Sequence, residues 1–136
     1  MSKLQLKQLW QLLQREQQGY QQLYPLLQCQ ARLLTNQDHQ GLLIHNPRQL
    51  QLTEQLAQLA RQREQLQTEL GSNTLDALAK RLPDSLARPL LELWQTLLTL
   101  ARRCRALNDS NGRLLASQKE WLEQRMGVTQ GVYHPD

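Results

Sequence analysis

One stretch of this chain constrains its fold more than any other. From Leu86 to Trp121, one set of positions recurs at steps that alternate between four and three residues. An average spacing of 3.5 residues is typical of an α-helix that packs lengthwise against another helix. It predicts a single helix over residues 85–126, about 60 Å long at about 1.5 Å per residue. The positions of this seam are Leu86, Leu90, Leu93, Leu97, Leu100, Cys104, Leu107, Asn111, Leu114, Gln118 and Trp121.

A second row of apolar residues widens this stripe; it consists of Trp94, Leu98, Ala101, Leu115, Leu122 and Met126. In its second half the helix also contains Asn108, Asn111 and Gly112, which weaken it, the glycine by about 1 kcal/mol relative to alanine. A buried asparagine can set the register of packed helices, and a glycine permits their close approach. The alternative is a helix that is kept marginally stable so that a segment of another protein can dock on it.

The composition favours helices and excludes sheets. Of the 136 residues, 32 are Leu and 23 are Gln, whereas the chain has one Ile, two Val and no Phe. Strands need β-branched and aromatic side chains to fill a pleated face, but Leu and Gln keep their rotamer freedom in a helix. We therefore predict an all-α protein, an elongated antiparallel helical bundle that is like a coiled coil and has one long C-terminal helix. Sheet-based folds, including most α/β enzyme architectures, are excluded.

Capping and turn residues divide the chain into elements. Ser2 can cap a first helix, and Asn46 followed by Pro47 predicts the start of a second helix. Gly127 and Gly131 are expected to end the last helix. The expected helices cover residues 2–35, 47–70, a short piece over 74–82 that has little to bury, and 85–126. This division gives one helical domain over residues 1–127 and a flexible tail over residues 128–136.

The residue types that carry catalysis or bind metals are scattered along the chain. The histidines are His39, His45 and His134, and no His, Cys, Asp or Glu residues are grouped at a catalytic or metal-ligand spacing. None of the six glycines belongs to a phosphate-binding loop. We therefore expect no catalytic residue, no metal and no cofactor.

The net charge of +4 is mild, and its densest cluster is Arg102, Arg103 and Arg105. A nucleic-acid site usually adds stacking aromatics or a recognisable module, and neither lies nearby, so a solvated helix face is favoured. No apolar run reaches the roughly 18 to 20 residues of a membrane span, and the N-terminus does not read as a secretory signal. Cys29 and Cys104 lie far apart, which is typical of reduced thiols in a cytoplasmic protein.

Two motifs near the C-terminus resemble those of a known family. The segment Leu107-Asn108-x-x-Asn111-Gly112-x-Leu114-Leu115 resembles the leucine–asparagine–asparagine–glycine signature in the last helix of FlgN-type flagellar export chaperones. The tail Tyr133-His134-Pro135-Asp136 is similar to their C-terminal Tyr-Gly-Pro-Asp-Gly motif, with His134 in place of the usual glycine. The general layout also agrees, because a variable middle separates a Leu-rich first half from one long last helix.

The resemblance implies a non-catalytic chaperone of the bacterial cytoplasm. Such a protein binds the C-terminal segments of the hook-associated proteins FlgK and FlgL, which would otherwise associate prematurely. It then brings these clients to the cytoplasmic domain of FlhA, the flagellar type III export gate. By position, the resemblance assigns gate binding to Tyr133. It points to Leu107, Asn108, Asn111, Gly112, Leu114 and Leu115 as the helix signature, which serves either the client or the bundle itself; we expect these residues to bind the client.

The residues themselves indicate where a client docks. After Cys104 the seam becomes more polar, so its apolar residues are less fully used by the core. We therefore add Trp121 and Leu122 to the expected client site, together with part of the first helix. One alternative is a structural coiled coil or adaptor that uses the stripe for self-association. A weak homo-oligomer is also among the expected partners of the chaperone. A nucleic-acid-binding bundle is a third class, favoured by the arginine cluster alone.

Overall fold

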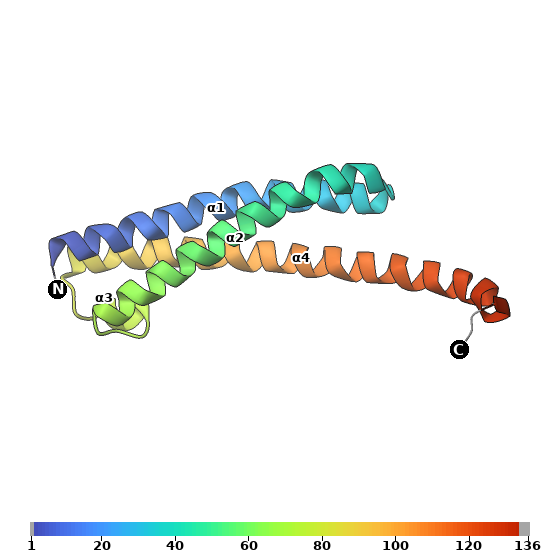
Figure 1. The fold of residues 1–136 in the computed structure, drawn as a ribbon. Coiled ribbons are helices and arrows are strands. Elements are labelled where there is room, and N and C mark those ends of the chain that lie inside the picture. The colour runs from blue at the N-terminus through green and yellow to red at the C-terminus, as the bar shows by residue number, and fades with distance from the viewer. Residues whose placement is uncertain (1, 134–136) are drawn as a thin grey trace.

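The structure is a computed structural model that describes the backbone of residues 2–133 and the side chains of residues 2–126. Long helices pack against one another, and the described residues contain no strand (Figure 1). The helices are α1 (Lys3–Thr35), α2 (His39–Glu69), α3 (Leu75–Ala79) and α4 (Asp84–Tyr133). The prediction of an all-α bundle with a long C-terminal helix is confirmed.

Helices α1 and α2 form an antiparallel hairpin (Figure 1). A capping box starts α1, because the Ser2 hydroxyl accepts the Gln5 backbone N–H at 3.1 Å and the Ser2 N–H donates to the Gln5 side chain at 3.3 Å. The two helices come close at Gly19, which is buried; a Cβ atom there would overlap the side chain of Leu56. A glycine therefore sets how closely the hairpin packs.

The second helix begins eight residues earlier than its sequence predicts. The side chain of Asp38 accepts the Gly41 N–H at 2.9 Å and caps α2, so Pro47 lies inside the helix. The expected start at Asn46 and Pro47 is therefore wrong. Pro47 removes the hydrogen bond to the carbonyl of Leu43. Because Leu43 is 77% exposed, water can satisfy this carbonyl and the helix continues.

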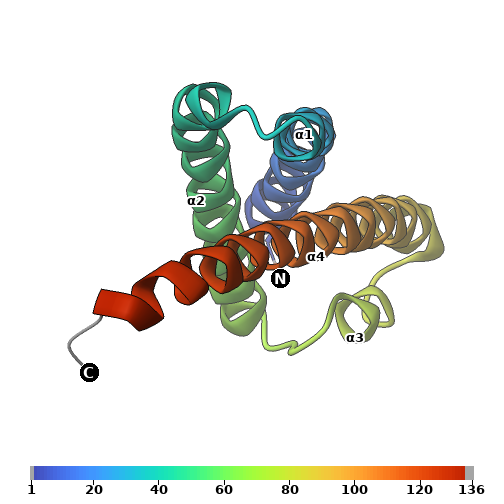
Figure 2. The ribbon, with the colours of Figure 1, turned by 90° about the vertical axis from the view of Figure 1, so that its right-hand side faces the viewer.

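Helix α4 runs parallel to α1, whereas the consecutive long helices are antiparallel (Figure 2). Three side chains of α4 donate to backbone carbonyls of α1, and in every case the two residues are 84 positions apart, a multiple of seven. The donors and acceptors are Cys104 with Tyr20 at 3.6 Å, Asn111 with Leu27 at 2.9 Å, and Gln118 with Leu34 at 2.7 Å. The predicted seam therefore faces α1 in one constant register.

The core consists of two leucine clusters that lie one after the other along the bundle. The first cluster comprises Leu9, Leu13, Leu66, Leu70, Leu75, Leu78, Leu90 and Leu97. The second comprises Leu23, Leu27, Leu56 and Cys104. Two residues of α3 belong to the first cluster: Leu75 is 1% and Leu78 is 0% exposed. Since burial of one leucine contributes about 1.5–3 kcal/mol, the expectation that this piece buries little is wrong.

The last helix extends well past the hairpin. Gln118 contacts Leu34, and α1 ends one residue later at Thr35, so the following part of α4 projects beyond α1 (Figure 1). The expected end at Gly127 is also wrong, because α4 continues to Tyr133 and passes through Gly131. A glycine weakens a helix by about 1 kcal/mol but does not end it unless the backbone turns left-handed. His134, Pro135 and Asp136 lie outside the described residues.

Candidate protein-docking surface

A groove runs between α2 and α4. Both helices pack along α1 but scarcely touch each other, which leaves a hollow of about 770 Å³. Leu23 and Leu27 of α1 form its floor, Ala57 lies on the α2 wall, and Leu98 and Ala101 lie on the α4 wall. The floor and much of both walls are apolar, and the walls carry small side chains. This shape can accommodate a further helix.

A polar cluster closes one end of this groove. Arg63 of α2 donates to the Glu16 carboxylate of α1 at 2.8 Å and lies over the ring of Trp94 of α4, 4.9 Å from its centroid. The same guanidinium donates to Gln67 at 2.9 Å. Burial raises the pKa of Glu16, which is 2% exposed, although the nearby Arg63 partly offsets this rise. The cluster joins all three long helices at this point.

A second polar layer lies further along the bundle. The side-chain amide of Asn111, which is 4% exposed, donates to the Leu27 carbonyl at 2.9 Å and to Gln30 at 3.0 Å. Gln49 of α2 also donates to Gln30 at 3.0 Å and bonds to His45 at 2.9 Å. Among the described residues, every buried side-chain nitrogen and oxygen has a hydrogen-bond partner. The layer therefore joins three helices without an unpaired polar atom.

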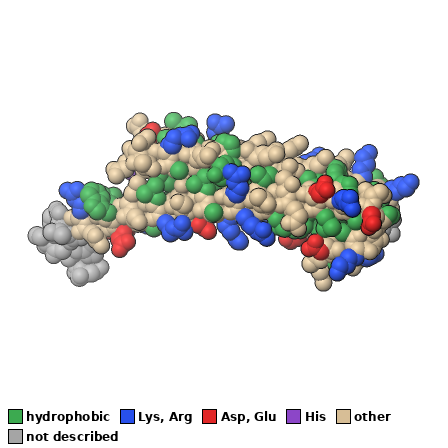
Figure 3. All heavy atoms as spheres, turned by 180° about the vertical axis from the view of Figure 1, so that it is seen from behind, with side chains coloured by type: hydrophobic (Ala, Val, Ile, Leu, Met, Phe, Trp, Pro, Cys, Tyr) green, Lys and Arg blue, Asp and Glu red, His purple; other side chains and the backbone are tan. Residues whose placement is uncertain are grey.

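Toward its C-terminal end, α4 exposes large apolar side chains. Leu115 is 54%, Trp121 is 53%, Leu122 is 51% and Met126 is 48% exposed. Arg125 covers part of Trp121, with its guanidinium 4.7 Å from the ring centroid. Hydrophobic side chains are visible at this end of α4, beside the residues drawn in grey (Figure 3). Of these, Trp121, Leu122 and Met126 follow Gln118, which contacts Leu34 near the end of α1.

The groove and this exposed end belong to one face of α4. Trp94, Ala101 and Asn108 are spaced seven residues apart and line the groove. Two further steps of seven lead to Leu115 and Leu122. Because a heptad spacing keeps residues on one helix face, the exposed leucines continue the groove wall toward the C-terminal end of α4. The second apolar row of the sequence is therefore a second packing face, distinct from the seam that faces α1.

Comparison with known proteins assigns the chain to a family. A family model with the description "FlgN protein" matches residues 1–131. The chain belongs to the FlgN family. Membership in the FlgN family supports the general role of a flagellar export chaperone, which is not an enzymatic role. No curated protein and no solved structure matches the chain.

The FlgN signature divides into an inward and an outward half. Asn111 is buried, and Leu107 and Leu114 are half-buried on the same side. Asn108, Gly112 and Leu115 are exposed, as are Trp121 and Leu122. The expected client site is therefore not one surface: its inward residues belong to the bundle. Gly112 does not permit a close approach of helices, because a Cβ atom there would meet nothing within 4 Å.

Sequence reasoning missed an exposed apolar stripe at the start of α2. Leu43 is 77%, Ile44 is 76% and Leu50 is 58% exposed. Because the sequence predicts that α2 begins at residue 47, Leu43 and Ile44 fell in an expected loop. The signal was present, since Leu43 and Leu50 are seven residues apart and a further seven lead to Ala57 on the groove wall.

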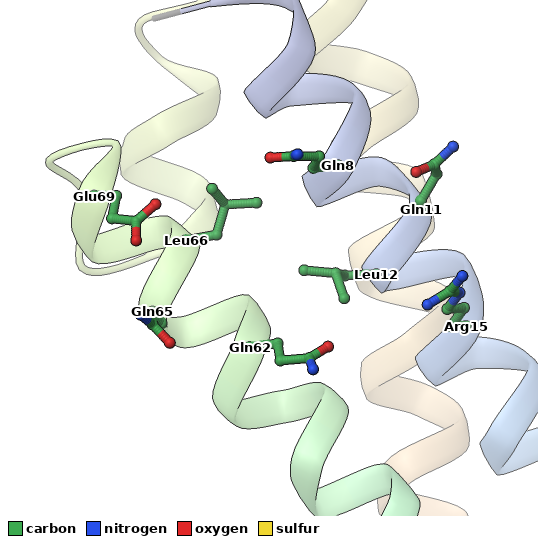
Figure 4. A pocket seen from close by; sticks show the side chains of 8 residues that line it. All are labelled: Gln8, Gln11, Leu12, Arg15, Gln62, Gln65, Leu66 and Glu69. Atoms are coloured by element: carbon green, nitrogen blue, oxygen red, sulfur yellow. The ribbon is translucent and has the colours of Figure 1, made fainter.

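A second cleft lies between α1 and α2, away from the FlgN signature. Figure 4 shows that its side chains come from the first half of α1 and the last part of α2, and glutamines predominate among them. Its volume is about 320 Å³.

Within the described residues, no three His, Cys, Asp or Glu residues are grouped to hold a metal ion. No helix of that same part of the chain is long and apolar enough to cross a membrane.

Proposed function

We propose that this FlgN-family protein binds the C-terminal segments of the hook-associated proteins FlgK and FlgL in the bacterial cytoplasm. It prevents their premature association and delivers them to the flagellar export gate, FlhA. One observation supports the client site: Leu115, Trp121 and Leu122 are about half exposed toward the C-terminal end of α4, and Trp121 and Leu122 follow Gln118, which contacts Leu34 near the end of α1. Exposed apolar groups grouped on one helix face are typical of a protein-binding site.

The affinity of this projecting end can be bounded by its area. Complete burial of a large apolar side chain contributes about 1.5–3 kcal/mol, so four half-exposed ones contribute roughly 3–6 kcal/mol. Association itself costs at least about 4 kcal/mol in lost freedom of motion. The projecting end alone therefore gives weak net binding. A client must also contact other parts of the molecule, and its release at the gate then requires the loss of only some of these contacts.

The client site is tested by the double substitution Leu115→Ser and Leu122→Ser. Both leucines are already exposed in the free protein, so we expect the melting temperature to change little. Loss of about 1 kcal/mol at each position should weaken binding of FlgK and FlgL C-terminal segments about thirtyfold, measured by calorimetry. Leu86→Ser is the matched control, because Leu86 is 52% exposed at the opposite end of α4.

An unfolded double variant would show that the two leucines are core residues, and unchanged binding would place the client elsewhere. If the wild-type chain binds neither client and light scattering shows a stable oligomer, the stripe serves self-association. That result would support the structural coiled coil instead.

Gate binding is proposed for Tyr133, the last residue of α4, whose side chain lies outside the described part. We expect Tyr133→Ala to leave client affinity and the helical spectrum unchanged. It should weaken binding of the client-loaded protein to the cytoplasmic domain of FlhA by about 2 kcal/mol or more, as loss of an aromatic anchor does. Calorimetry with the loaded variant measures this directly, and wild-type gate affinity would refute the assignment.

A further inference from the structure

The outer face of the α1–α2 hairpin has two clefts of matching composition. One is the glutamine-rich cleft of Figure 4, and the other, of about 490 Å³, lies further along the same two helices. Each cleft is lined by one leucine of α1, one leucine of α2, one arginine and several glutamines. Among the described residues, none of α4 lines either cleft. The residues of the second cleft are Gln22, Leu26, Arg48, Gln51, Leu52 and Gln55.

The region between the two clefts is the middle of this face. There α1 and α2 come close at Gly19, where a Cβ atom would overlap Leu56. Three residues earlier in α1, Glu16 bonds to Arg63 of α2 at 2.8 Å. Leu59 lies between these two contacts on α2, about level with Gly19, and is half-buried. We call this level the midpoint of the hairpin.

The leucines of the two clefts are arranged symmetrically about the midpoint. On α1, Leu12 and Leu26 lie seven residues before and after it, and on α2 Leu52 and Leu66 do the same. A twofold axis that crosses both helices here would lay each helix antiparallel on its own copy. Leu12 of one copy would then meet Leu26 of the other, and Leu52 would meet Leu66. A face with this symmetry is complementary to itself, as a twofold contact between identical chains requires.

The glutamines of this face follow the same symmetry. Gln55 and Gln62 lie four residues before and three residues after the midpoint, so the axis brings one opposite the other. A glutamine amide both donates and accepts hydrogen bonds. A face lined by glutamines can therefore bond to a second copy of itself without leaving a donor or an acceptor unpaired.

Charge identifies the occupant of this face more closely. Arg48 lies eleven residues before the midpoint and Glu69 lies ten residues after it. Both side chains are exposed, and the one salt bridge among the described side chains joins Arg63 and Glu16 instead. The twofold axis places Arg48 of each copy beside Glu69 of the other, which gives two ion pairs. An unrelated protein has no reason to match a pattern that repeats about the midpoint, whereas a second copy matches it at every position.

We propose that the outer face of the α1–α2 hairpin binds a second copy of this chain, in an antiparallel dimer whose twofold axis crosses the midpoint. Two helices from each copy enclose the leucines of the clefts, and glutamines and the two ion pairs border the contact. Because exposed ion pairs each contribute little, the dimer is reversible. The contact leaves α4 and the groove between α2 and α4 uncovered.

The oligomeric state of the full-length chain is the first test. Light scattering from micromolar to millimolar protein should show the mass rising from 15.9 kDa toward twice that value. A monomer at every concentration would overturn the proposal, since the face would then be solvated or covered by another protein.

Charge reversal tests which face forms the contact. Arg48→Glu and Glu69→Arg should each weaken dimerisation about tenfold or more, because each dimer contains the altered contact twice. Arg61→Glu is the matched control, since Arg61 is an exposed residue of α2 that lines neither cleft, and it should leave dimerisation unchanged. All three residues are exposed, so the helical spectrum and the melting temperature should stay as in the wild-type chain.

Rescue tests the antiparallel pairing itself. A mixture of the Arg48→Glu and Glu69→Arg chains should dimerise as the wild-type chain does, because opposite charges meet again at both contacts. Positions 48 and 69 are 21 residues apart on one helix, about 30 Å, so no contact within a single chain can produce this rescue. Two weakened variants that fail to restore each other would overturn the pairing of Arg48 with Glu69.

The remaining outcomes separate this dimer from the chaperone function. The charge variants should bind FlgK and FlgL C-terminal segments with wild-type affinity, because α4 takes no part in the contact. If the wild-type chain binds neither segment but its dimer responds to charge as described, the proposed function fails and the dimer stands. If the dimer ignores positions 48 and 69 and is lost in the Leu115→Ser and Leu122→Ser variant, it forms through α4, and the proposal is overturned.

Discussion

Adjacent residues of the FlgN signature have opposite roles in this structure. Asn111 points into the bundle and bonds to α1 through both of its amide hydrogens. Gly112 points outward into open space. A buried asparagine that is bonded to a neighbouring helix fixes the register of the two helices at some cost in stability. The exposed Gly112 makes no packing contact that requires a glycine. No contact within the described residues therefore offsets the loss of about 1 kcal/mol of helix stability that a glycine causes.

This contrast predicts opposite effects for the same substitution at two glycines. Gly112→Ala should raise the free energy of unfolding by about 1 kcal/mol, because the helix gains propensity and nothing is displaced. Gly19→Ala should lower it by up to about 2 kcal/mol, because the new Cβ atom overlaps the buried side chain of Leu56. Urea unfolding of the two variants measures both values. If Gly112→Ala instead lowered the free energy of unfolding, position 112 would have a packing contact that is not seen among the described residues.

At the scale of elements, the start of α2 and the end of α4 were both predicted at the wrong residue, because a proline and a glycine there do not interrupt the helix. Pro47 lies inside α2, and Gly127 lies inside α4. Asp38 provides an alternative cap upstream of Pro47, and the carbonyl that the proline leaves unbonded belongs to an exposed residue. Breaker residues therefore lower helix stability locally, and the nearest good cap decides where the helix begins.

The position of Pro47 inside α2 can be tested by Pro47→Ala. A proline in a helix interior destabilises the folded state by about 3 kcal/mol relative to alanine. Proline also restricts the unfolded chain, so its replacement by alanine stabilises the unfolded state by up to about 1 kcal/mol. We therefore expect the variant to be about 2 kcal/mol more stable, measured by urea unfolding. If α2 instead began at Pro47, the substitution would be neutral or destabilising, since proline is favoured at the first helical position.

At the scale of the whole molecule, the bundle is a rod with a projecting end. The 50 residues of α4 span about 75 Å, and the α1–α2 hairpin covers only part of this length (Figure 1). A rod buries less apolar surface than a sphere of the same mass, which explains why so many leucines remain exposed. The exposed large apolar side chains lie at the starts of α1, α2 and α4 and toward the C-terminal end of α4.

Small-angle X-ray scattering tests this shape. A compact domain of this length has a radius of gyration of about 14 Å. A rod whose length is set by α4 should give a value of about 20 Å. The measurement is made at several concentrations with light scattering as the control for self-association. A monomer with the compact value would mean that the end of α4 folds back onto the bundle.

The helical class, the long last helix and its seam follow from the amino-acid sequence alone. The 3.5-residue spacing and the scarcity of Val, Ile and Phe act locally, and both favour helices over strands. The FlgN signature was also recognisable from its residues. The inward position of Asn111 and the outward position of Leu115 were not, because the spacing alone cannot say which of two rows faces a neighbour.

The arrangement of the helices around one another depends on contacts between residues far apart in the sequence. The parallel pairing of α1 with α4 depends on contacts between residues 84 positions apart, such as Asn111 with Leu27. The groove exists because α2 and α4 both pack on α1 and scarcely on each other. Neither property can be derived from a single helix. A leucine seam can pack against many partners, whereas buried polar side chains need specific acceptors and therefore select one arrangement of the helices.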